Sequence, residues 1–233
     1  MHLKRLGASK SYNIPKKTAK FAVLPSSGAH AKGECIPVGV FLRDILMLAK
    51  TLSEAKTILN NGYLLVDGKI IKNYKHPVGF MDVVALPKIK KYYRILSKSG
   101  KLVPVEIDSK ESLFKLGKII SKKQLNGGKM QFGLHDGRTF VMAAKKAIYK
   151  VGDTVQISVP TQEVKAHVSM DIGNIVMVTG GRHVGSIGKL KKLEIVESPE
   201  PNMVIVDIDG KELRTLKDYI FVIGTKTSLI KLE

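Results

Sequence analysis

Residues 41–84 constrain the fold of this chain more than any other stretch. Apolar residues there first recur at the spacing of an amphipathic helix: Phe41, Leu42, Ile45, Leu48, Ala49 and Leu52. Thr51 and Glu54 have the spacing of a capping box, which predicts that a second helix begins at this point. Gly62 supplies a residue that adopts the left-handed conformation easily, so the second helix can end there.

A tight β-ribbon is predicted to follow the two helices. Residues 63–66 and 69–72 are strand-like, and Asp67-Gly68 between them is a strong hairpin signal. Val83 and Val84 can add a further strand. The stretch therefore predicts a compact unit of two short helices and a small sheet.

Net charge is the second constraint. The 233 residues hold 39 Lys and Arg against 20 Asp and Glu, which gives a net charge of +19. An excess of this size indicates a polyanionic partner, with nucleic acid favoured over an anionic membrane surface. No apolar run approaches the ~20 residues of a membrane span. The single cysteine, Cys35, excludes an intramolecular disulfide and fits a reducing compartment.

The unit at residues 41–84 carries a rim of basic side chains. They can bind phosphates, or they can be the solvated lysines of an ordinary α+β unit. The order of elements resembles the S4 RNA-binding domain, through R-D in the first helix, S-E-A-K-x-I-L-N-N-G, V-D-G and P-V-G-x-M-D-V. This resemblance favours RNA binding by Arg43, Lys50, Lys56, Lys69, Lys72 and Lys75.

Residues 1–37 are a basic arm rich in helix breakers. Its Gly and Pro residues exclude a long helix, and we expect the arm to stay mobile until a partner orders it. A transit peptide would also be basic and acid-poor, but it needs an amphipathic helix that these breakers disrupt. The candidate RNA contacts in the arm are Lys4, Arg5, Lys10, Lys16, Lys17 and Lys20.

The arm also carries a family resemblance. HLKRLGASKSYNIPKK resembles the opening of the S4e family of small-subunit ribosomal proteins from archaea and eukaryotes. With the S4-like unit next in line, the likeness extends over the whole chain, and the short start resembles the archaeal members. The resemblance implies a protein of the cytoplasmic ribosome that binds small-subunit ribosomal RNA beside neighbouring ribosomal proteins.

Residues 88–168 show short strands separated by turns, which indicates a small antiparallel barrel or sandwich. Asp108 and Glu111 have the spacing of a short helix start. GGKMQFGLHDGRT resembles the central domain of the S4e family. The candidate RNA contacts in this segment are Lys88, Lys90, Lys91, Arg94 and Arg138.

His135 beside Asp136 invites an enzymatic interpretation, because a histidine next to a carboxylate can act as a general base. Adjacent hairpin residues usually point apart, however, and Asp136-Gly137 is a turn dipeptide with no nucleophile indicated nearby. An RNA contact by His135 or Arg138 is the favoured interpretation.

The C-terminal segment is rich in glycine. Gly180 and Gly185 have the gap of a P-loop, but Ser186 stands where its lysine is required. DIGNIVMVTGGRHVGSIGKLKKLEIV instead resembles a KOW motif, which implies a β-turn-β piece of a small barrel. Later strands, with a turn at Asp209-Gly210, would complete that barrel. The resemblance makes Arg182, His183 and Lys189 the candidate RNA contacts, while the acidic residues nearby predict a surface that faces solvent or a basic neighbour.

The sequence therefore predicts a multi-domain α+β protein. Its parts are a basic arm (1–37), an S4-like RNA-binding domain (38–87), a central β-barrel (88–168) and a C-terminal KOW-type β-barrel (169–233). The predicted role is structural, with no catalysis, cofactor, metal ion, small-molecule substrate, membrane contact or homo-oligomer. Two alternatives stay open: an RNA-modifying enzyme that grips its substrate with the S4-like unit, and a KOW-bearing translation or transcription factor.

Overall fold

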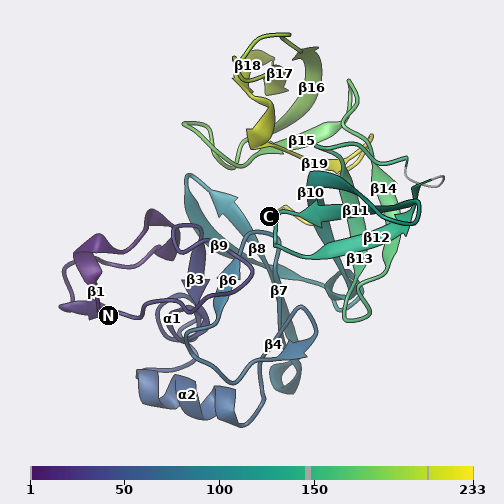
Figure 1. Ribbon diagram of the computed structural model, residues 1–233. Helices are drawn as coiled ribbons and strands as arrows, with labels where there is room; N and C mark the ends of the chain where they lie inside the picture. The colour runs from purple at the N-terminus through teal and green to yellow at the C-terminus, as the bar shows by residue number, and fades with distance from the viewer. Residues whose placement is uncertain (1, 145–147, 209, 233) are drawn as a thin grey trace. The chain divides into compact units, whose positions relative to one another are not determined.

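The computed structural model describes residues 2–144, 148–208 and 210–232, and the chain is mostly β and multi-domain (Figure 1). It divides into two compact units. The first holds the described residues up to Lys115 with Val159–Thr161 and Leu232, and the second holds Leu116–Ser158 and Gln162–Lys231. Within the described residues, no helix is both long and apolar enough to cross a membrane.

The arm is folded as part of the first unit. β1 (Leu3–Lys4) pairs antiparallel with β2 (Phe21–Ala22). Between these strands Tyr12 is 1% exposed, and its hydroxyl donates to the carbonyl of Val23 at 3.2 Å. The arm is therefore folded, whereas the sequence predicted an arm that stays mobile until a partner orders it. Breakers exclude a long helix, but short turns can still bury single apolar side chains in the core of the same unit.

The first predicted helix is shorter than its apolar pattern suggests. α1 (Val38–Val40) continues as a wider helical turn through Phe41–Ile45, and the chain leaves the helix at Met47, whose φ is +54°. Leu48, predicted to be on the buried face, is 43% exposed. The reason lies in Thr51, whose extended backbone at the start of the next helix requires the first helix to stop earlier.

The second predicted helix is confirmed as α2 (Leu52–Asn60). The hydroxyl of Thr51 accepts a hydrogen bond from the backbone N–H of Glu54 at 3.2 Å, and the Glu54 carboxylate accepts one from the N–H of Lys50 at 2.8 Å. These bonds satisfy donors that the start of a helix leaves open. Gly62, with φ +71°, follows the helix as predicted.

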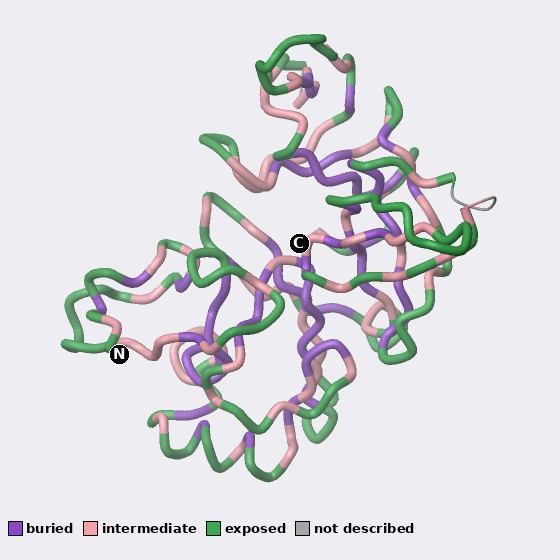
Figure 2. The backbone as a smooth tube through the Cα atoms, viewed as in Figure 1, coloured by how far each residue is buried: buried purple, intermediate pink, exposed green. Residues whose placement is uncertain are grey.

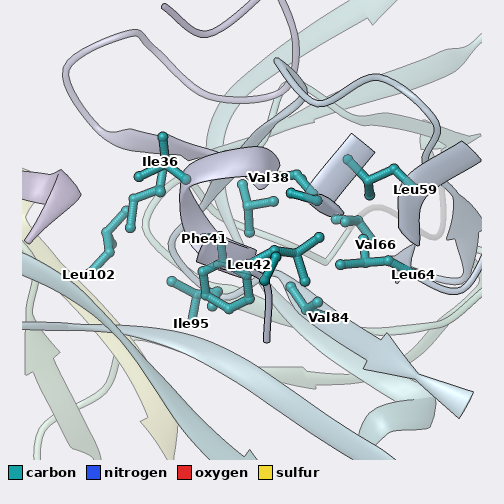
Figure 3. Close-up of a cluster of buried hydrophobic side chains, with 14 of the residues drawn as sticks. Ile36, Val38, Phe41, Leu42, Leu59, Leu64, Val66, Val84, Ile95 and Leu102 are labelled. Carbon is teal, nitrogen blue, oxygen red and sulfur yellow. The ribbon is translucent and has the colours of Figure 1, made fainter. Parts of the chain in front are cut away.

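The helices and the sheet of the first unit enclose one apolar core (Figure 3). Burial of a large apolar side chain contributes about 1.5–3 kcal/mol, so these residues are the main stabilising group of the unit. All are at most 6% exposed: Ile36, Val38, Phe41, Leu42, Leu59, Leu64, Val66, Val84, Ile95 and Leu102.

Two sheets frame this core. β3 (Cys35–Pro37) pairs with β6 (Pro77–Gly79). Asp67 and Gly68 have φ of +47° and +72°, which confirms the predicted two-residue hairpin. The predicted boundary after residue 87 falls inside the larger sheet. That sheet has the order β5-β4-β7-β8-β9, from β4 (Leu65–Val66), β5 (Lys69–Ile70), β7 (Val83–Leu86), β8 (Lys91–Lys98) and β9 (Lys101–Ile107).

A buried ionic cluster joins distant segments of the first unit. The ammonium of Lys115 lies 2.9 Å from Asp67 Oδ2 and 2.5 Å from Asp82 Oδ1. Asp82 Oδ2 lies 2.9 Å from His30 Nε2 and accepts a hydrogen bond from the N–H of Gly79 at 2.8 Å. Lys115 is fully buried and the two carboxylates are at most 5% exposed. Buried charges of this kind are tolerated only when they are paired and hydrogen-bonded.

Position 79 has to be glycine for this cluster to form. A Cβ atom at Gly79 would collide with the imidazole ring of His30. Because glycine has no side chain, the ring of His30 can lie over position 79 and reach Asp82.

The second unit contains two five-stranded sheets. The first has the order β12-β11-β10-β13-β14, from β10 (Phe114–Leu125), β11 (Lys129–Leu134), β12 (Thr139–Ala143), β13 (Thr154–Ser158) and β14 (Val164–Val168). The second has the order β18-β17-β16-β15-β19, from β15 (Ile175–Val178), β16 (Ile187–Glu194), β17 (Met203–Ile208), β18 (Lys211–Leu216) and β19 (Ile220–Gly224).

Each sheet of the second unit has its own apolar cluster. Phe132 and Val155 belong to the first cluster, and Val176 and Val222 belong to the second. β19 runs beside β13 and β14, which places the two sheets in one unit. Of the predicted Asp209-Gly210 turn, residue 209 lies outside the described residues, and the flanking strands β17 and β18 pair in register.

We predict that Lys115→Met destabilises the protein strongly. The variant would leave Asp67 and Asp82 buried without their cation, and breaking a buried ion pair in this way costs about 3–5 kcal/mol. Urea unfolding measures the loss. Lys98→Met, at an exposed position of β8, is the control and should shift stability by less than about 0.5 kcal/mol. Equal stability of both variants would contradict a stabilising role for the cluster.

We also predict that acid destabilises the protein by protonating the carboxylate of Asp82. Burial alone would raise the pKa of this carboxyl, but the Lys115 ammonium and the hydrogen bond from His30 hold it below its usual range. A depressed folded-state pKa contributes stability above the unfolded value of about 3.9, and this stability is lost as pH falls further. Asp82→Asn should be less stable at neutral pH and should show a flatter decline below about pH 4 in urea titrations.

Candidate nucleic-acid interface

Most of the predicted basic contacts on the first unit are exposed. They come from the arm, from α2, from the β4–β5 hairpin and its following loop, and from the turn before β8. An exposed lysine ammonium presents three N–H donors, which suits phosphate oxygens from several directions. The exposed members are Lys4, Lys10, Lys16, Lys17, Lys20, Lys50, Lys56, Lys69, Lys72, Lys75, Lys88, Lys90 and Lys91.

Two aromatic rings organise part of this surface. The ammonium groups of Lys56 and Lys75 lie 4.4 and 5.6 Å from the ring centroid of Tyr74, which brings α2 and the loop after β5 together. The ammonium of Lys88 lies 3.6 Å from the ring centroid of Tyr63. Cation–π contacts of about 0.5–1 kcal/mol restrain these exposed side chains without neutralising their charge.

Arg43 is less available than the lysines around it. It is half-buried, and its Nη2 lies 2.7 Å from the carboxylate of Asp44. The R-D pair of the first helix is therefore an ion pair within the protein, which reduces the net charge that Arg43 offers to a phosphate.

The structure argues against the predicted RNA contact of Arg5. Arg5 is 5% exposed, its Nε donates to the carbonyl of Pro15 at 2.6 Å, and its Nη2 lies 3.9 Å from Asp44. Its guanidinium ties the turns of the arm together, which the spacing of basic residues could not reveal.

The structure also argues against the predicted RNA contact of Arg94. Its side chain is fully buried, its Nη1 lies 2.7 Å from Glu111 Oε1, and its Nη2 donates to the carbonyls of Glu111 and Phe114 at 3.1 and 2.8 Å. Burial lowers the pKa of Arg94 to about 10, against the opposing effect of Glu111, so it stays charged at neutral pH. Instead of a helix capped by Asp108, the chain forms a single 3-10 turn, Glu111–Leu113, that holds this arginine.

His135 and Asp136 point to different partners, as predicted for adjacent residues of a turn. His135 Nδ1 accepts a hydrogen bond from the N–H of Lys118 at 3.2 Å, and its ring meets Phe221 edge-on. Asp136 lies 3.2 Å from Nε of Arg138. Arg138 is half-buried in this ion pair, so the predicted RNA contact would be made by a partly neutralised side chain.

The glycine-rich loop of the second unit presents its basic residues outward. Arg182 and His183 are exposed in the bend after β15, and Lys189 is exposed on β16. A Cβ atom at Gly180 would collide with the ring of Tyr219, so the loop lies directly on that ring. The lack of a side chain at position 180 thus permits this close approach.

The acidic residues of the C-terminal sheet are largely used within that sheet. Glu194 Oε2 lies 2.9 Å from Arg214 and its Oε1 lies 3.6 Å from Lys192. Lys191 pairs with Glu212 across the sheet. The C-terminal sheet therefore carries paired positive and negative charges, whereas the surface of the first unit is basic.

Sequence reasoning missed the ionic cluster of Lys115, Asp67, Asp82 and His30. A lysine between Phe114 and Leu116, at the start of an apolar strand, was the available signal. It also missed Lys118, a half-buried residue whose ammonium donates to the carbonyl of Asp218 at 2.6 Å. Burial lowers the pKa of Lys118 to about 8, although Asp218 opposes this shift.

Comparison with known proteins gives the family. Residues 89–164 match the sequence model described as Ribosomal family S4e, residues 40–84 match the S4 domain, and residues 1–33 match the RS4NT domain. The small ribosomal subunit protein eS4 of Methanothermobacter thermautotrophicus is 43% identical over 99% of this chain and 95% of its own length. The chain belongs to the S4e family. The predicted S4 domain and the predicted family are thus confirmed.

Further members of the S4e family show the same relationship. The eS4 protein of Archaeoglobus fulgidus is 44% identical over 98% of this chain and 95% of its own length. The crystal structure of the 30S ribosomal protein S4e from Thermoplasma acidophilum is similar with a TM-score of 0.71 and 34% identity. The structural similarity covers 84% of this chain and 98% of the Thermoplasma acidophilum chain. The KOW motif stays a prediction.

We predict that substituting a buried cation lowers stability, whereas substituting exposed cations weakens RNA binding. Arg94→Gln should destabilise the protein by about 2–4 kcal/mol, below the range for a fully enclosed pair because Glu111 is 16% exposed. Lys69→Gln with Lys72→Gln should change stability by less than about 0.5 kcal/mol each. In RNA titrations across a salt series, only the lysine pair should flatten the slope of log affinity against log salt, by about 1 per lost phosphate contact. A flatter slope for folded Arg94→Gln would restore Arg94 as an RNA contact.

Proposed function

We propose that this protein is a structural constituent of the small ribosomal subunit that binds ribosomal RNA mainly through phosphate contacts. The observation that carries the proposal is family membership over nearly the whole chain, joined to the exposed lysines of the first unit. Each lysine that meets a phosphate releases condensed counterions, which gives binding that depends steeply on salt. No bond is made or broken in this role.

Similarity to small-subunit ribosomal proteins argues against the enzyme and factor alternatives. Relatives among the small-subunit proteins match 98–99% of this chain, from the arm to the C-terminal sheet. The S4e family model also matches residues 89–164, directly after the S4 domain, where a modifying enzyme of this kind would carry different sequence. The protein is therefore not an enzyme.

The finer contacts are part of the proposal. We infer that the exposed lysines of the arm, α2 and the β4–β5 hairpin meet RNA, and that Arg182, His183 and Lys189 do so from the second unit. The two sheets of the second unit would then act as small barrels, the later one of KOW type. The paired charges around Glu194 make that outer face suited to a neighbouring ribosomal protein rather than to RNA.

The arm is proposed to bind RNA from a folded state. Because Tyr12 is buried and Arg5 is held by Pro15, the arm needs less ordering on binding than a disordered tail would. Its exposed lysines are then carried on fixed turns, which favours recognition of RNA shape over base sequence.

Co-sedimentation with small subunits through a high-salt gradient tests this function. The tagged wild-type protein should remain with the subunit, whereas a variant with Lys4, Lys10, Lys16, Lys17 and Lys20 replaced by Gln should be lost at lower salt while staying folded. The same five-site variant should flatten the salt slope for isolated ribosomal RNA by up to about 5. A wild-type protein found only in the free pool would contradict the proposal.

A further inference from the structure

The outer half of β10 carries side chains that the core does not use. The strand begins with buried positions, but every residue from Ile120 to Leu125 is exposed (Figure 2). Six residues at ~3.3 Å each extend for about 20 Å. Gly127 and Gly128, with φ of +78° and +67°, turn the chain into β11, and β12 adds a third strand. We call the three-stranded part formed by residues 120–133 and 139–143 the ribbon.

The two faces of the ribbon differ in chemistry. On the inner face, Met130, Phe132, Phe140 and Met142 belong to the apolar cluster of this sheet. Because successive strand residues point to opposite sides, the residues between them form the outer face. In register across the three strands, that outer face presents Ser121, Lys123 and Leu125, then Lys129, Gln131 and Gly133, then Thr139, Val141 and Ala143.

One end of the outer face is shallow because Gly133 has no side chain. Gly133 is the register partner of Ser121, and a Cβ atom at position 133 would collide with the Ser121 hydroxyl. Thr139 stands opposite Gly133 on the other side and is exposed. The end of this face nearest the β11–β12 turn therefore holds small hydroxyl groups. The middle row carries Lys123, Gln131 and Val141.

Neighbouring lysines of β10 are used differently. Lys122 belongs to the inner side, where its ammonium donates to the carbonyl of Tyr149 at 3.0 Å and lies 5.6 Å from the Phe132 ring centroid. Lys123 and Lys129 are exposed, and neither has an ion-pair partner within the described part of the chain. From residue 116 to residue 152 the sequence holds one acid, Asp136, which is buried. The positive charge of the outer face is therefore not neutralised by its own sheet.

We propose that the outer face of the ribbon docks on double-stranded RNA, across its minor groove. That groove is wide and shallow and displays 2′-hydroxyls between two rows of phosphates. Ser121, Gln131 and Thr139 can exchange hydrogen bonds with the hydroxyls, while Lys123 and Lys129, toward the Gly127-Gly128 turn, can reach phosphates along one edge of the groove. This inference rests on the proposed function and adds a surface of the second unit to the candidate interface.

The test uses the full chain with Lys123→Gln and Lys129→Gln together. The probes are a duplex RNA of about 20 base pairs, longer than the ~16 that a double-stranded-RNA domain spans, and a single-stranded uridine oligomer of equal length. Fluorescence anisotropy across a salt series should show a loss of about tenfold in duplex affinity and a slope reduced by about 2. Single-strand affinity should change by less than about twofold, since the hydroxyl pattern of the groove is absent there.

Lys122→Gln is the matched control, because it removes one positive charge from the same strand on the other face. It should keep the duplex affinity within about twofold and the slope within about 0.5 of the wild type. Urea midpoints of all variants establish that each is folded.

Several results would overturn the inference. If the wild type enters small subunits but the double variant binds duplex RNA as tightly and with the same slope, the ribbon is not an RNA surface and the proposed function stands. Equal losses on the single strand would refute groove recognition. Normal duplex binding by a double variant that fails to enter subunits would show that this face meets a protein. A wild type that does not enter subunits would instead remove the proposed function.

Discussion

The fold of the first unit depends on the ion pairs made by the ammonium of Lys115. This lysine lies at the start of β10 and meets Asp67 from the β4–β5 hairpin and Asp82 from the turn before β7, while His30 of the arm meets the same Asp82. Hydrophobic burial supplies most of the stability of this unit, but it is not directional. A buried ion cluster is directional, because each charge must find its partner at hydrogen-bond distance. Segments far apart in the chain are thereby required to fold together.

Signals that act within a few residues could be predicted from the sequence. The Asp67-Gly68 hairpin, the Thr51 cap of α2 and the left-handed Gly62 all appear as expected, since each depends on the backbone chemistry of the residues themselves. The early end of the first helix at Met47 was not predicted, although the Thr51 cap that requires it could be recognised in the sequence. The apolar repeat continued past the point where the helix had to stop.

The candidate interface shows the same division. Exposed lysines on α2 and the β4–β5 hairpin lie where the pattern of the S4 domain implied. Arg5 and Arg94 do not, because their partners, Pro15 and Glu111, are not visible from local spacing. A basic residue in the sequence carries no sign of whether it will hold the interior or face a partner. Lys122 and Lys123 make the point most directly, since they are chemically identical neighbours that a β-strand sends to opposite sides.

The packing of the His30 ring over Gly79 restricts how these two positions can change within the family. Any side chain at position 79 would occupy the volume of the imidazole, so the two positions cannot change independently. A relative that gains even an alanine there must also shorten or move the residue that corresponds to His30, and must then supply Asp82 with another donor. The two sites, 49 residues apart, are thus expected to covary, and an N-terminal arm transplanted from a distant relative would fit only where both had been inherited together.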